Sequence, residues 1–400
     1  MKILQLTKKF PYPLKDGESI AVTNLSKSLV AHDCEMTLLS MNTSKHFVEI
    51  EQLPDTYNHY KSIHTVYLDN RVTAIGAFTN LFSPDSYHVS RFDYKEYREK
   101  LIELLKAEHF DIIQLETLYL APYIETIKRY SKGKVVMRSH NAEFEIWNRI
   151  VDSTSLLPKR WYLKYLTKKL RKFELERLDH YDALVTVTQR DLKKYKSLGY
   201  KGKGMYSPIG ININQYEPVE NDLQRANLSF IGSLDWIPNL NGLFWFLKEI
   251  FPRILKEYPS LVMNIAGRNT PKPIVDLSSD NILIHGEVDS AIDFINDYPI
   301  MIVPLLSGSG MRVKILEGMA LEKVVISTTI GAEGINAAHK ESILIADTPA
   351  EFFECIKWLL DSPDQMTEVG KKARQFIGEY FDESNNAKKL VSFYNSILID

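Results

Sequence analysis

Short apolar runs alternate with helical patterns along the whole chain, and the series occurs twice. The runs of the first series span residues 2–7, 35–41, 65–68, 111–116, 134–139 and 183–188, and those of the second span 228–234, 261–267, 282–288, 299–305, 324–328 and 343–346. Such alternation is typical of a parallel sheet with helices on both faces, whose strands are apolar along their length because both faces are buried. We therefore expect an α/β protein with two doubly wound, Rossmann-like domains.

A polar stretch rich in Pro, Gly and Asn, residues 206–221, separates the two series and looks like a linker. We expect an N-terminal domain over 1–207, a C-terminal domain over 208–380, and a final helix over 381–400 that packs back on the first domain. A length of 400 residues suits two domains. Two such domains would face a cleft at the carboxyl ends of their sheets, where open α/β folds bind ligands.

Composition excludes several classes of protein. Apolar residues make up 44% and charged residues 25%, as in globular proteins, and a formal net charge of −2 gives no sign of a nucleic-acid partner. Cys34 and Cys355 are the only cysteines, far apart and in no CxxC pattern, so we expect neither a disulfide nor a bound metal. Apolar runs are too short for a signal peptide or a membrane-crossing helix, so we predict a cytoplasmic protein.

The stretch GSGMRVKILEGMA, residues 308–320, follows the apolar run 299–305. Gly308, Ser309 and Gly310 are expected at the carboxyl end of that strand, with a helix starting near Met311. Free backbone N–H groups at a helix start attract anions such as phosphate, and glycines let a ligand approach the backbone closely.

Charged residues follow these glycines. Arg312 and Lys314 add positive charge, and Glu317 could accept hydrogen bonds from ribose hydroxyls. The stretch therefore predicts a cradle for a nucleotide diphosphate. The alternative is an ordinary strand-to-helix turn with a solvated basic face.

Several segments together resemble the group 1 glycosyltransferases of family 4 type, which are retaining enzymes of the GT-B fold. The segments that carry the resemblance are NLSFIGSLDWIPNLNGLFWF, NIAGRN, ILIHGEV and VPLLSGSGMRVKILEGMALEKVVISTTIGAEGI in the second half, and RSHNAEFEIW, VTVTQRDLKKY and SPIGIN before them. The resemblance covers nearly the whole chain and is densest from about 228 to 335. It implies two Rossmann-like domains and a nucleotide-sugar donor.

The resemblance also implies roles for individual residues. Amides around Ser309, Gly310 and Met311 would face the diphosphate, and Glu317 would bind ribose. The other implied contacts to the nucleotide sugar come from Gly17, Gly232, Arg268, His285, Gly286 and Val288. His140 would lie near the sugar or the acceptor. Asn141 and Glu143 would contact the acceptor, or alternatively cap the next helix.

Two departures from the family pattern bear on the site. The first acid of the family's paired-glutamate motif is replaced by Ser309, and the Arg and Lys usually found after the first strand of the second domain are absent from GSLDWIPN. We expect Arg312 and Lys314, with Arg268, to supply the phosphate-binding charge instead, since Arg binds phosphate bidentately and Lys acts as a point charge. With His140, Arg312 and Lys314 are the predicted catalytic residues.

The predicted activity is transfer of a sugar from a nucleotide sugar to a glycan or glycolipid hydroxyl, with retention, in cell-surface polysaccharide or lipopolysaccharide assembly. No cofactor and no metal are expected. A nucleotide-sugar epimerase, a phosphorylase or a catalytically degenerate nucleotide-binding protein could share the fold. A dehydrogenase is disfavoured, because TKKFPYPLKDGES stands where GxGxxG would follow the first strand.

Residues 157–178 form a basic, aromatic segment. Between Lys159 and Lys172 it carries seven cations and no acid, together with Trp161, Tyr162 and Tyr165. An amphipathic basic helix of this kind could contact an anionic membrane, which would place the protein at the inner face of the cell membrane. The alternative is a solvated helix face with its aromatic residues in the core.

Overall fold

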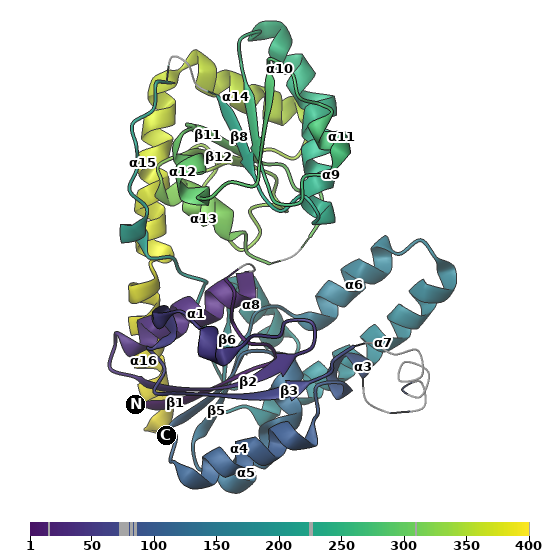
Figure 1. The fold of residues 1–400 in the computed structure, drawn as a ribbon, viewed down its shortest axis with the longest axis vertical. Helices are drawn as coiled ribbons and strands as arrows, with labels where there is room; N and C mark the ends of the chain where they lie inside the picture. Colours follow the sequence, from purple (N-terminus) through teal and green to yellow (C-terminus); the bar gives the residue numbers. More distant parts are fainter. Residues whose placement is uncertain are drawn as a thin grey trace. The chain divides into compact units, whose positions relative to one another are not determined.

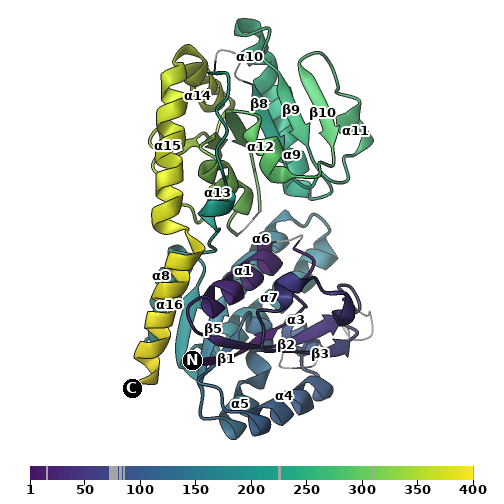
Figure 2. The same cartoon turned by 60° about the vertical axis from the view of Figure 1, so that its left-hand side comes forward.

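The computed structural model describes residues 1–14, 17–71, 80, 83, 86–223, 227–308 and 310–399. It contains two compact units, one formed by Met1–Gly210 together with Glu383–Asp400, and the other by Ile211–Asp382. Each unit is built on one parallel sheet with helices on its faces (Figures 1 and 2). Each predicted apolar run contains a strand, and the predicted α/β fold with two Rossmann-like domains is confirmed.

The first sheet has the order β3-β2-β1-β4-β5-β6-β7, with every pair parallel. Its strands are β1 (Lys2–Thr7), β2 (Glu35–Thr43), β3 (Ser62–Leu68), β4 (Ile112–Leu115), β5 (Lys134–Ser139), β6 (Ala183–Thr186) and β7 (Lys203–Tyr206). The chain order reverses between β1 and β4, and ligands of open α/β sheets bind at such a switch point. Strand β7 was not predicted, because KGMY is short and only partly buried at the edge of the sheet.

Helices cover both faces of this sheet. They are α1 (Gly17–Val30), α3 (Tyr87–Ser90), α4 (Lys95–Ala107), α5 (Ile124–Tyr130), α6 (Glu143–Ser153), α7 (Leu157–Glu176), α8 (Gln189–Ser197) and α16 (Glu383–Leu398). Neighbouring residues of one strand enter opposite cores, because side chains alternate along a strand. Ile113 packs in the cluster that includes α4, α5 and α7, whereas Ile112 packs in the cluster with α1 and α16.

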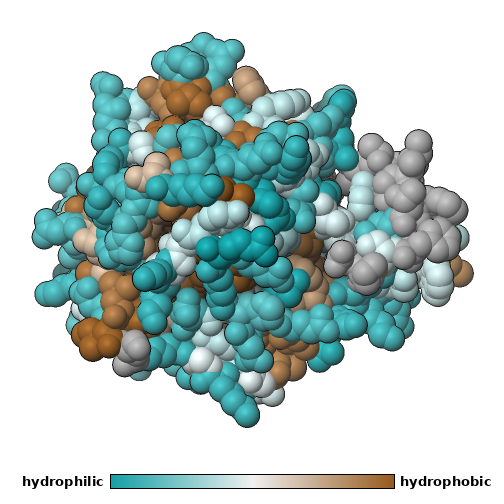
Figure 3. All heavy atoms as spheres, turned by 90° about the horizontal axis from the view of Figure 1, so that it is seen from below, coloured by the Kyte–Doolittle hydropathy of each residue, from teal (hydrophilic) through white to brown (hydrophobic). Residues whose placement is uncertain are grey.

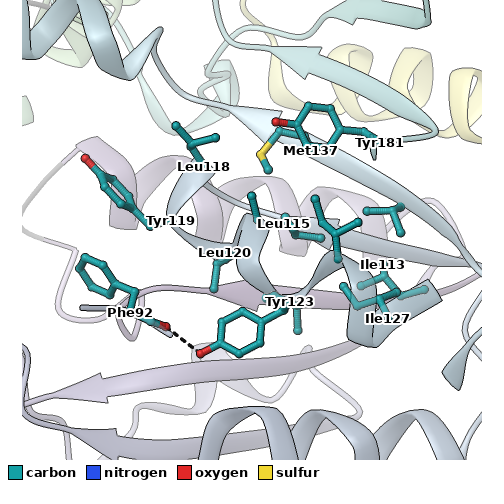
Figure 4. Packing of buried hydrophobic residues seen from close by; sticks show 14 of the residues in the cluster. Phe92, Ile113, Leu115, Leu118, Tyr119, Leu120, Tyr123, Ile127, Met137 and Tyr181 are labelled. Carbon is teal, nitrogen blue, oxygen red and sulfur yellow. Dashed lines mark hydrogen bonds between the residues drawn. The ribbon is translucent and has the colours of Figure 1, made fainter. Parts of the chain in front are cut away.

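Helix α4 illustrates how the sequence pattern produces this packing. Tyr97, Leu101, Leu104 and Leu105 recur at helical spacing and are buried, while the opposite side of the helix is charged. The face at the bottom of Figure 1, where α4 and α5 lie, is covered mainly by hydrophilic side chains with scattered apolar ones (Figure 3). Inside the core, the Tyr123 hydroxyl donates a 2.7 Å hydrogen bond to the Phe92 carbonyl (Figure 4).

Helix α16 belongs to the first unit although it follows the second unit in the chain. Helix α15 ends at Tyr380 and α16 begins at Glu383, so the helical tail breaks where the sequence predicted. Leu390 and Tyr394 are fully buried in the core that α16 shares with α1. The Tyr394 hydroxyl donates a 2.5 Å hydrogen bond to Gln114 Oε1 of β4.

The second sheet has the order β10-β9-β8-β11-β12-β13 and is also parallel. Its strands are β8 (Leu228–Ile231), β9 (Met263–Ala266), β10 (Ile282–Gly286), β11 (Ile300–Val303), β12 (Val324–Ser327) and β13 (Leu344–Ile345). Its helices are α9 (Ile237–Trp245), a π-helical turn (Phe246–Ile250), α10 (Phe251–Glu257), α11 (Lys272–Val275), α12 (Ala291–Asn296), α13 (Val313–Ala320), α14 (Pro349–Asp361) and α15 (Pro363–Tyr380). The switch point of this sheet lies between β8 and β11. Among the described helices, none combines the length and apolar content that a membrane crossing requires.

Candidate functional site

Lys314 lies at the switch point of the second sheet. It stands in the first turn of α13, and its Nζ donates to the Ile231 carbonyl at 2.9 Å and to Asn239 Oδ1 at 3.1 Å. The ammonium also lies 4.7 Å from the centre of the Phe230 ring. These contacts hold one cation against the carboxyl end of β8 and the start of α9.

The charge of Lys314 is unfavourable in this position. Burial, reinforced by the nearby charge of Arg312, lowers the pKa of Lys314 to about 7, with Glu317 acting in the opposite direction. The residue as a whole is only partly buried by its exposed area. An ammonium carries three N–H donors and two are used by Ile231 and Asn239. An anion that came within reach of the third would favour the protonated form.

Gly232 leaves the space that the Lys314 ammonium needs. A Cβ atom at this position would lie 2.7 Å from Asn239 Nδ2 and 3.0 Å from Lys314 Nζ. Any side chain here would therefore displace Asn239 or the ammonium. Glycine is needed because of this close approach, not because of a left-handed backbone.

Arg312 is the second cation of the group and stands at the N-cap position of α13. Its side chain is buried, Nη1 donates to the Gly310 carbonyl at 2.8 Å, and the guanidinium lies 5.2 Å over the Trp236 ring. A Cβ at Gly308 would lie 2.6 Å from Arg312 Nη2. The guanidinium is thus packed between Trp236 and the glycine loop.

The glycine loop also sets where α13 begins. Gly308 has a φ of 118° and Gly310 a φ of 84°, left-handed conformations that interrupt a right-handed helix. The helix therefore starts at Val313 instead of near Met311, and Met311 is buried in the loop before it. Ser309 lies outside the described residues.

Glu317 lies one turn after Lys314 on the same helix. The Tyr216 hydroxyl donates to Glu317 Oε1 at 3.2 Å. Burial raises the pKa of Glu317, while the Tyr216 hydrogen bond and the Lys314 charge lower it. The structure thus brings Gly232, Lys314 and Glu317 into one cluster with Arg312.

Other predicted residues of this unit lie along the same edge of the sheet. Arg268 follows β9, and its Nη2 lies 3.4 Å from Ser233 Oγ in the loop after β8. His285 and Gly286 close β10, at the outer edge, and Val288 follows them. The His285 ring contacts Asn264 Oδ1, at 3.1 Å, and the Phe294 ring, at 5.4 Å, instead of the Lys314 cluster.

In the first unit, His140 follows β5 and contacts a buried ion pair. Its Nε2 lies 3.0 Å from Glu116 Oε2, which also accepts a 2.9 Å hydrogen bond from Arg138 Nη1. Glu116 and Arg138 are almost fully buried. Burial opposes the charge of Glu116, but Arg138 and His140 hold the pKa of this carboxyl at about 2. A permanent carboxylate therefore orients the His140 ring.

Glu143 begins α6, where its carboxylate accepts a 2.8 Å hydrogen bond from the Tyr119 hydroxyl. The N-cap residue is Ala142, so neither Asn141 nor Glu143 caps this helix through its side chain. The carboxylate of Glu174, from α7, instead accepts hydrogen bonds from the first two N–H groups of α6. Gly17 begins α1, and a Cβ there would meet nothing within 4 Å.

Sequence reasoning missed several partners of these residues. In the second unit they are Tyr216, Trp236 and Asn239, and in the first unit they are Tyr119, Glu116 and Arg138. Glu116 and Arg138 had a detectable signal, because each places a charge within or directly after an otherwise apolar strand, in DIIQLE and KVVMRS. A buried charge in such a strand requires a partner. Among the described residues, no group of three or more His, Cys, Asp or Glu could hold a metal ion.

Comparison with known proteins identifies one part of the chain. Residues 225–362 match the family model described as "Glycosyl transferases group 1". Most of the second unit is therefore similar to the group 1 glycosyltransferases. The matched stretch, called the group 1 domain below after the family that it resembles, contains Gly232, Arg312, Lys314 and Glu317, whereas Tyr216 precedes it.

The whole chain is also similar to other proteins over nearly its full length. A Klebsiella pneumoniae protein described as "Uncharacterized 44.6 kDa protein in cps region" is 25% identical over 95% of this chain and 96% of its own length. Among solved structures, sucrose-phosphate synthase from Thermosynechococcus elongatus has a TM-score of 0.70 at 15% identity, with all of both chains covered. HepE of Anabaena in complex with UDP has a TM-score of 0.70 at 12% identity, covering 99% of this chain and 100% of its own. Outside the group 1 domain these structures establish the fold, which is GT-B.

Proposed function

We propose that this protein is a retaining glycosyltransferase that uses a nucleotide-diphosphate sugar as donor. The observation that carries the proposal is the cluster of Lys314, Arg312 and Gly232 at the switch point of the group 1 domain. The two cations match the negative charge of a diphosphate. The glycine has no side chain, so a diphosphate can approach the backbone closely. Solved structures of HepE contain UDP or UDP-glucose, which supports a uridine nucleotide as the first donor to test.

The cations have a direct role in the proposed reaction. As the bond between sugar and phosphate breaks, negative charge grows on the departing diphosphate. Lys314 and Arg312 are already held by Ile231, Asn239 and Gly310, so they stabilise this charge without a rearrangement of the site. A diphosphate also restores the proton to Lys314, whose pKa is about 7 without a ligand. Glu317 accepts hydrogen bonds from the ribose.

The acceptor side is assigned to the first unit. His140 lies at the carboxyl end of β5, held by the Glu116 carboxylate. In the proposed mechanism it contacts the transferred sugar, and the departing phosphate oxygen takes the proton of the acceptor hydroxyl. This front-face route needs no nucleophile from the protein. The cps-region relative supports cell-surface polysaccharide assembly as the setting.

A series of ligand-binding measurements tests the donor assignment. Thermal unfolding is followed with UDP, GDP, UDP-glucose and GDP-mannose, because a ligand that binds only the folded state raises the midpoint. We expect one class of nucleotide to raise the midpoint temperature of unfolding. The Lys314→Met variant should show no such increase. Lys248→Gln, at an exposed lysine of the second unit, is the matched control. If no nucleotide stabilises the protein, the proposal is wrong.

We also propose that the tip formed by α6 and α7 contacts an anionic membrane, which would suit a lipid-linked acceptor. Leu156, Leu157 and Trp161 are 66%, 75% and 69% exposed. Exposed cations accompany them, at Lys159, Arg160, Lys164 and Lys168. Apolar side chains that insert and cations that meet lipid phosphates are the two components of interfacial binding.

Vesicle flotation tests the membrane contact. The protein should float with vesicles that contain phosphatidylglycerol and remain below with pure phosphatidylcholine. The double variant Leu157→Ser with Trp161→Ser should lose flotation, whereas Val275→Ser, at an exposed valine of α11, should keep it. Absence of wild-type flotation on anionic vesicles would remove this contact while leaving the donor assignment intact.

A further inference from the structure

A cavity of about 880 Å³ lies within the first unit. It opens at the carboxyl ends of β1, β2 and β3, and residues that follow β4 complete it. It therefore adjoins the switch point between β1 and β4, as expected for a ligand site of a doubly wound sheet. Its size suits a mono- or disaccharide.

The lining of the cavity is strongly basic. The cations among its lining residues are Lys8, Lys9, Lys45, Arg71 and Arg91. They come from the ends of three strands and from the segment after α3, and the fold brings these segments together around one cavity. One carboxylate, Glu18, lines the cavity with them.

Two carboxylates offset part of this charge: Asp69 pairs with Arg71, and Glu18 pairs with the two lysines after β1, so the cavity stays positive through its other cations. Glu18 lies 3.2 Å from Lys8 Nζ and 3.9 Å from Lys9 Nζ. Burial raises the pKa of Glu18, but these two lysines and His140 lower it further, so this carboxylate is charged. Lys45 and Arg91 have no ion pair with any residue in the described part of the chain.

An aromatic pair lies beside these charges. The rings of Phe92 and Tyr119 are 5.2 Å apart, and the two side chains lie next to each other in Figure 4. Lys8 Nζ lies 4.7 Å over the Tyr119 ring, and the Arg91 guanidinium lies 5.1 Å from the centre of the Phe92 ring. Both rings are more than nine-tenths buried, and the two cations lie over them, so the aromatic pair holds Lys8 and Arg91 at the wall of the cavity.

The cavity is continuous with the residues assigned to the acceptor. Tyr119, which lines it, donates its hydroxyl hydrogen to Glu143. Glu18, which also lines it, lies close enough to His140 for the two to interact electrostatically. A saccharide in the cavity would therefore lie beside Tyr119 and Glu18, the residues that connect the cavity to Glu143 and His140.

We propose that this cavity binds an acidic saccharide, one that bears a phosphate or a carboxylate, and that this saccharide is the acceptor. The inference rests on the proposed glycosyltransferase function and adds the chemical class of its acceptor. Lys45 and Arg91 bind the anionic group, and the polar lining residues Thr43, Ser44 and Asn70 hydrogen-bond the sugar hydroxyls.

Calorimetric titration of the full chain tests this assignment, with glucose 6-phosphate, glucuronate, glucose and inorganic phosphate as probes. We expect one or both acidic sugars to bind at least tenfold more tightly than glucose and than inorganic phosphate. The sugar that binds better identifies phosphate or carboxylate as the recognised group. The affinity should fall with added salt, because the contacts are ionic.

Variants locate the binding site. Lys45→Gln and Arg91→Gln should each weaken the acidic sugar about tenfold, as expected for loss of one charge-assisted contact. Lys128→Gln, at an exposed lysine in the last turn of α5 that does not line the cavity, should not. Lys45 is exposed, so its variant tests the site even if Arg91→Gln fails to fold.

Several outcomes would overturn the inference. They are equal affinity for glucose and the acidic sugars, binding of none of the probes, and acidic-sugar binding that is insensitive to Lys45→Gln. UDP binding is measured on the same samples. UDP binding with any of these outcomes refutes the acidic acceptor alone, whereas absence of UDP binding refutes the proposed donor.

Discussion

The ammonium nitrogen of Lys314 lies 2.9 Å from the carbonyl oxygen of Ile231, so a lysine of α13 closes the end of strand β8. The glycosyltransferases that the sequence resembles usually have an Arg and a Lys directly after this strand, and GSLDWIPN has neither. Lys314 thus brings a positive charge to the position from another part of the chain. We infer that this contact replaces the missing pair.

Replacement of Lys314 by methionine keeps the aliphatic stem but removes the charge. We expect UDP to bind about tenfold to a hundredfold more weakly, equivalent to roughly 1.5–3 kcal/mol for a charged hydrogen bond. Calorimetric titration measures the change, and Lys248→Gln is the control. Unchanged affinity in a folded Lys314→Met variant would exclude Lys314 from the donor site.

The low pKa of Lys314 predicts that UDP binding takes up a proton. The folded pKa is about 7 and the ordinary value is 10.5, so at pH 8 most Lys314 side chains are neutral until the diphosphate arrives. The phosphates of UDP are already ionised at that pH. Titration at pH 8 in buffers of different ionisation enthalpy should show uptake of nearly one proton. Lys314→Met should show none, and equal uptake by both proteins would contradict the assignment.

The same pKa makes a prediction for stability. Between pH 7 and 10.5 the unfolded chain binds more protons at Lys314 than the folded chain, so stability gains from this group as the pH rises. Urea unfolding of the wild type and of Lys314→Met should therefore differ in slope between pH 7 and 9. The variant should lack the gain, and parallel curves would argue against a depressed pKa.

Gly232→Ala tests the space around the ammonium. The added Cβ would lie 3.0 Å from Lys314 Nζ and 2.7 Å from Asn239 Nδ2, so we expect UDP affinity to fall about tenfold as the ammonium shifts. Gly378→Ala is the matched control, because its Cβ would make an ordinary 3.5 Å contact in helix α15. If Gly232→Ala binds UDP like the wild type, the cluster tolerates a side chain there and the proposed cradle is wrong.

Glu116→Gln tests the buried ion pair beneath His140. Loss of the carboxylate leaves the charge of Arg138 buried without its partner, which costs on the order of 3–5 kcal/mol. The folded pKa of Glu116 is about 2 and its ordinary value is 4.5, so its stabilisation is present above pH 4.5 and is lost as the pH falls toward 2. Acid titration of the variant, followed by circular dichroism, should lack this loss. A variant as stable as the wild type would show that Arg138 needs no counter-charge.

The fold was largely predictable because parallel strands buried on both faces leave a strong apolar signal. Strand β5 illustrates this, since KVVMRS was predicted over 134–139 and forms a strand over Lys134–Ser139. Strand β7 was not found, because a short, half-exposed edge strand needs little apolar sequence. The start of α13 was placed two residues too early, because Gly308 and Gly310 take left-handed conformations and Arg312 stands at the N-cap instead of inside the helix.

The candidate site was predictable in its charges but not in its contacts. Arg312, Lys314 and Glu317 were identified because they follow a glycine loop at a strand end. Tyr216 lies 101 residues from Glu317 in sequence, and Asn239 lies 75 residues from Lys314. Contacts between residues so far apart in sequence can be predicted only when the order of the strands in the sheet is known. The cavity after β1, β2 and β3 was not predicted for the same reason, since its cations come from four separate segments of the chain.

The position of α16 has a consequence for how the protein is made. A ribosome synthesises Ile211–Asp382 in one continuous stretch, so that unit has all of its strands before α16 exists. The first unit must wait for Leu390 and Tyr394, which fill the gap beside α1. The nascent chain therefore holds a nearly finished sheet with one apolar face covered only in part until translation passes the second unit. The second unit should consequently complete its packing on the ribosome earlier than the first unit.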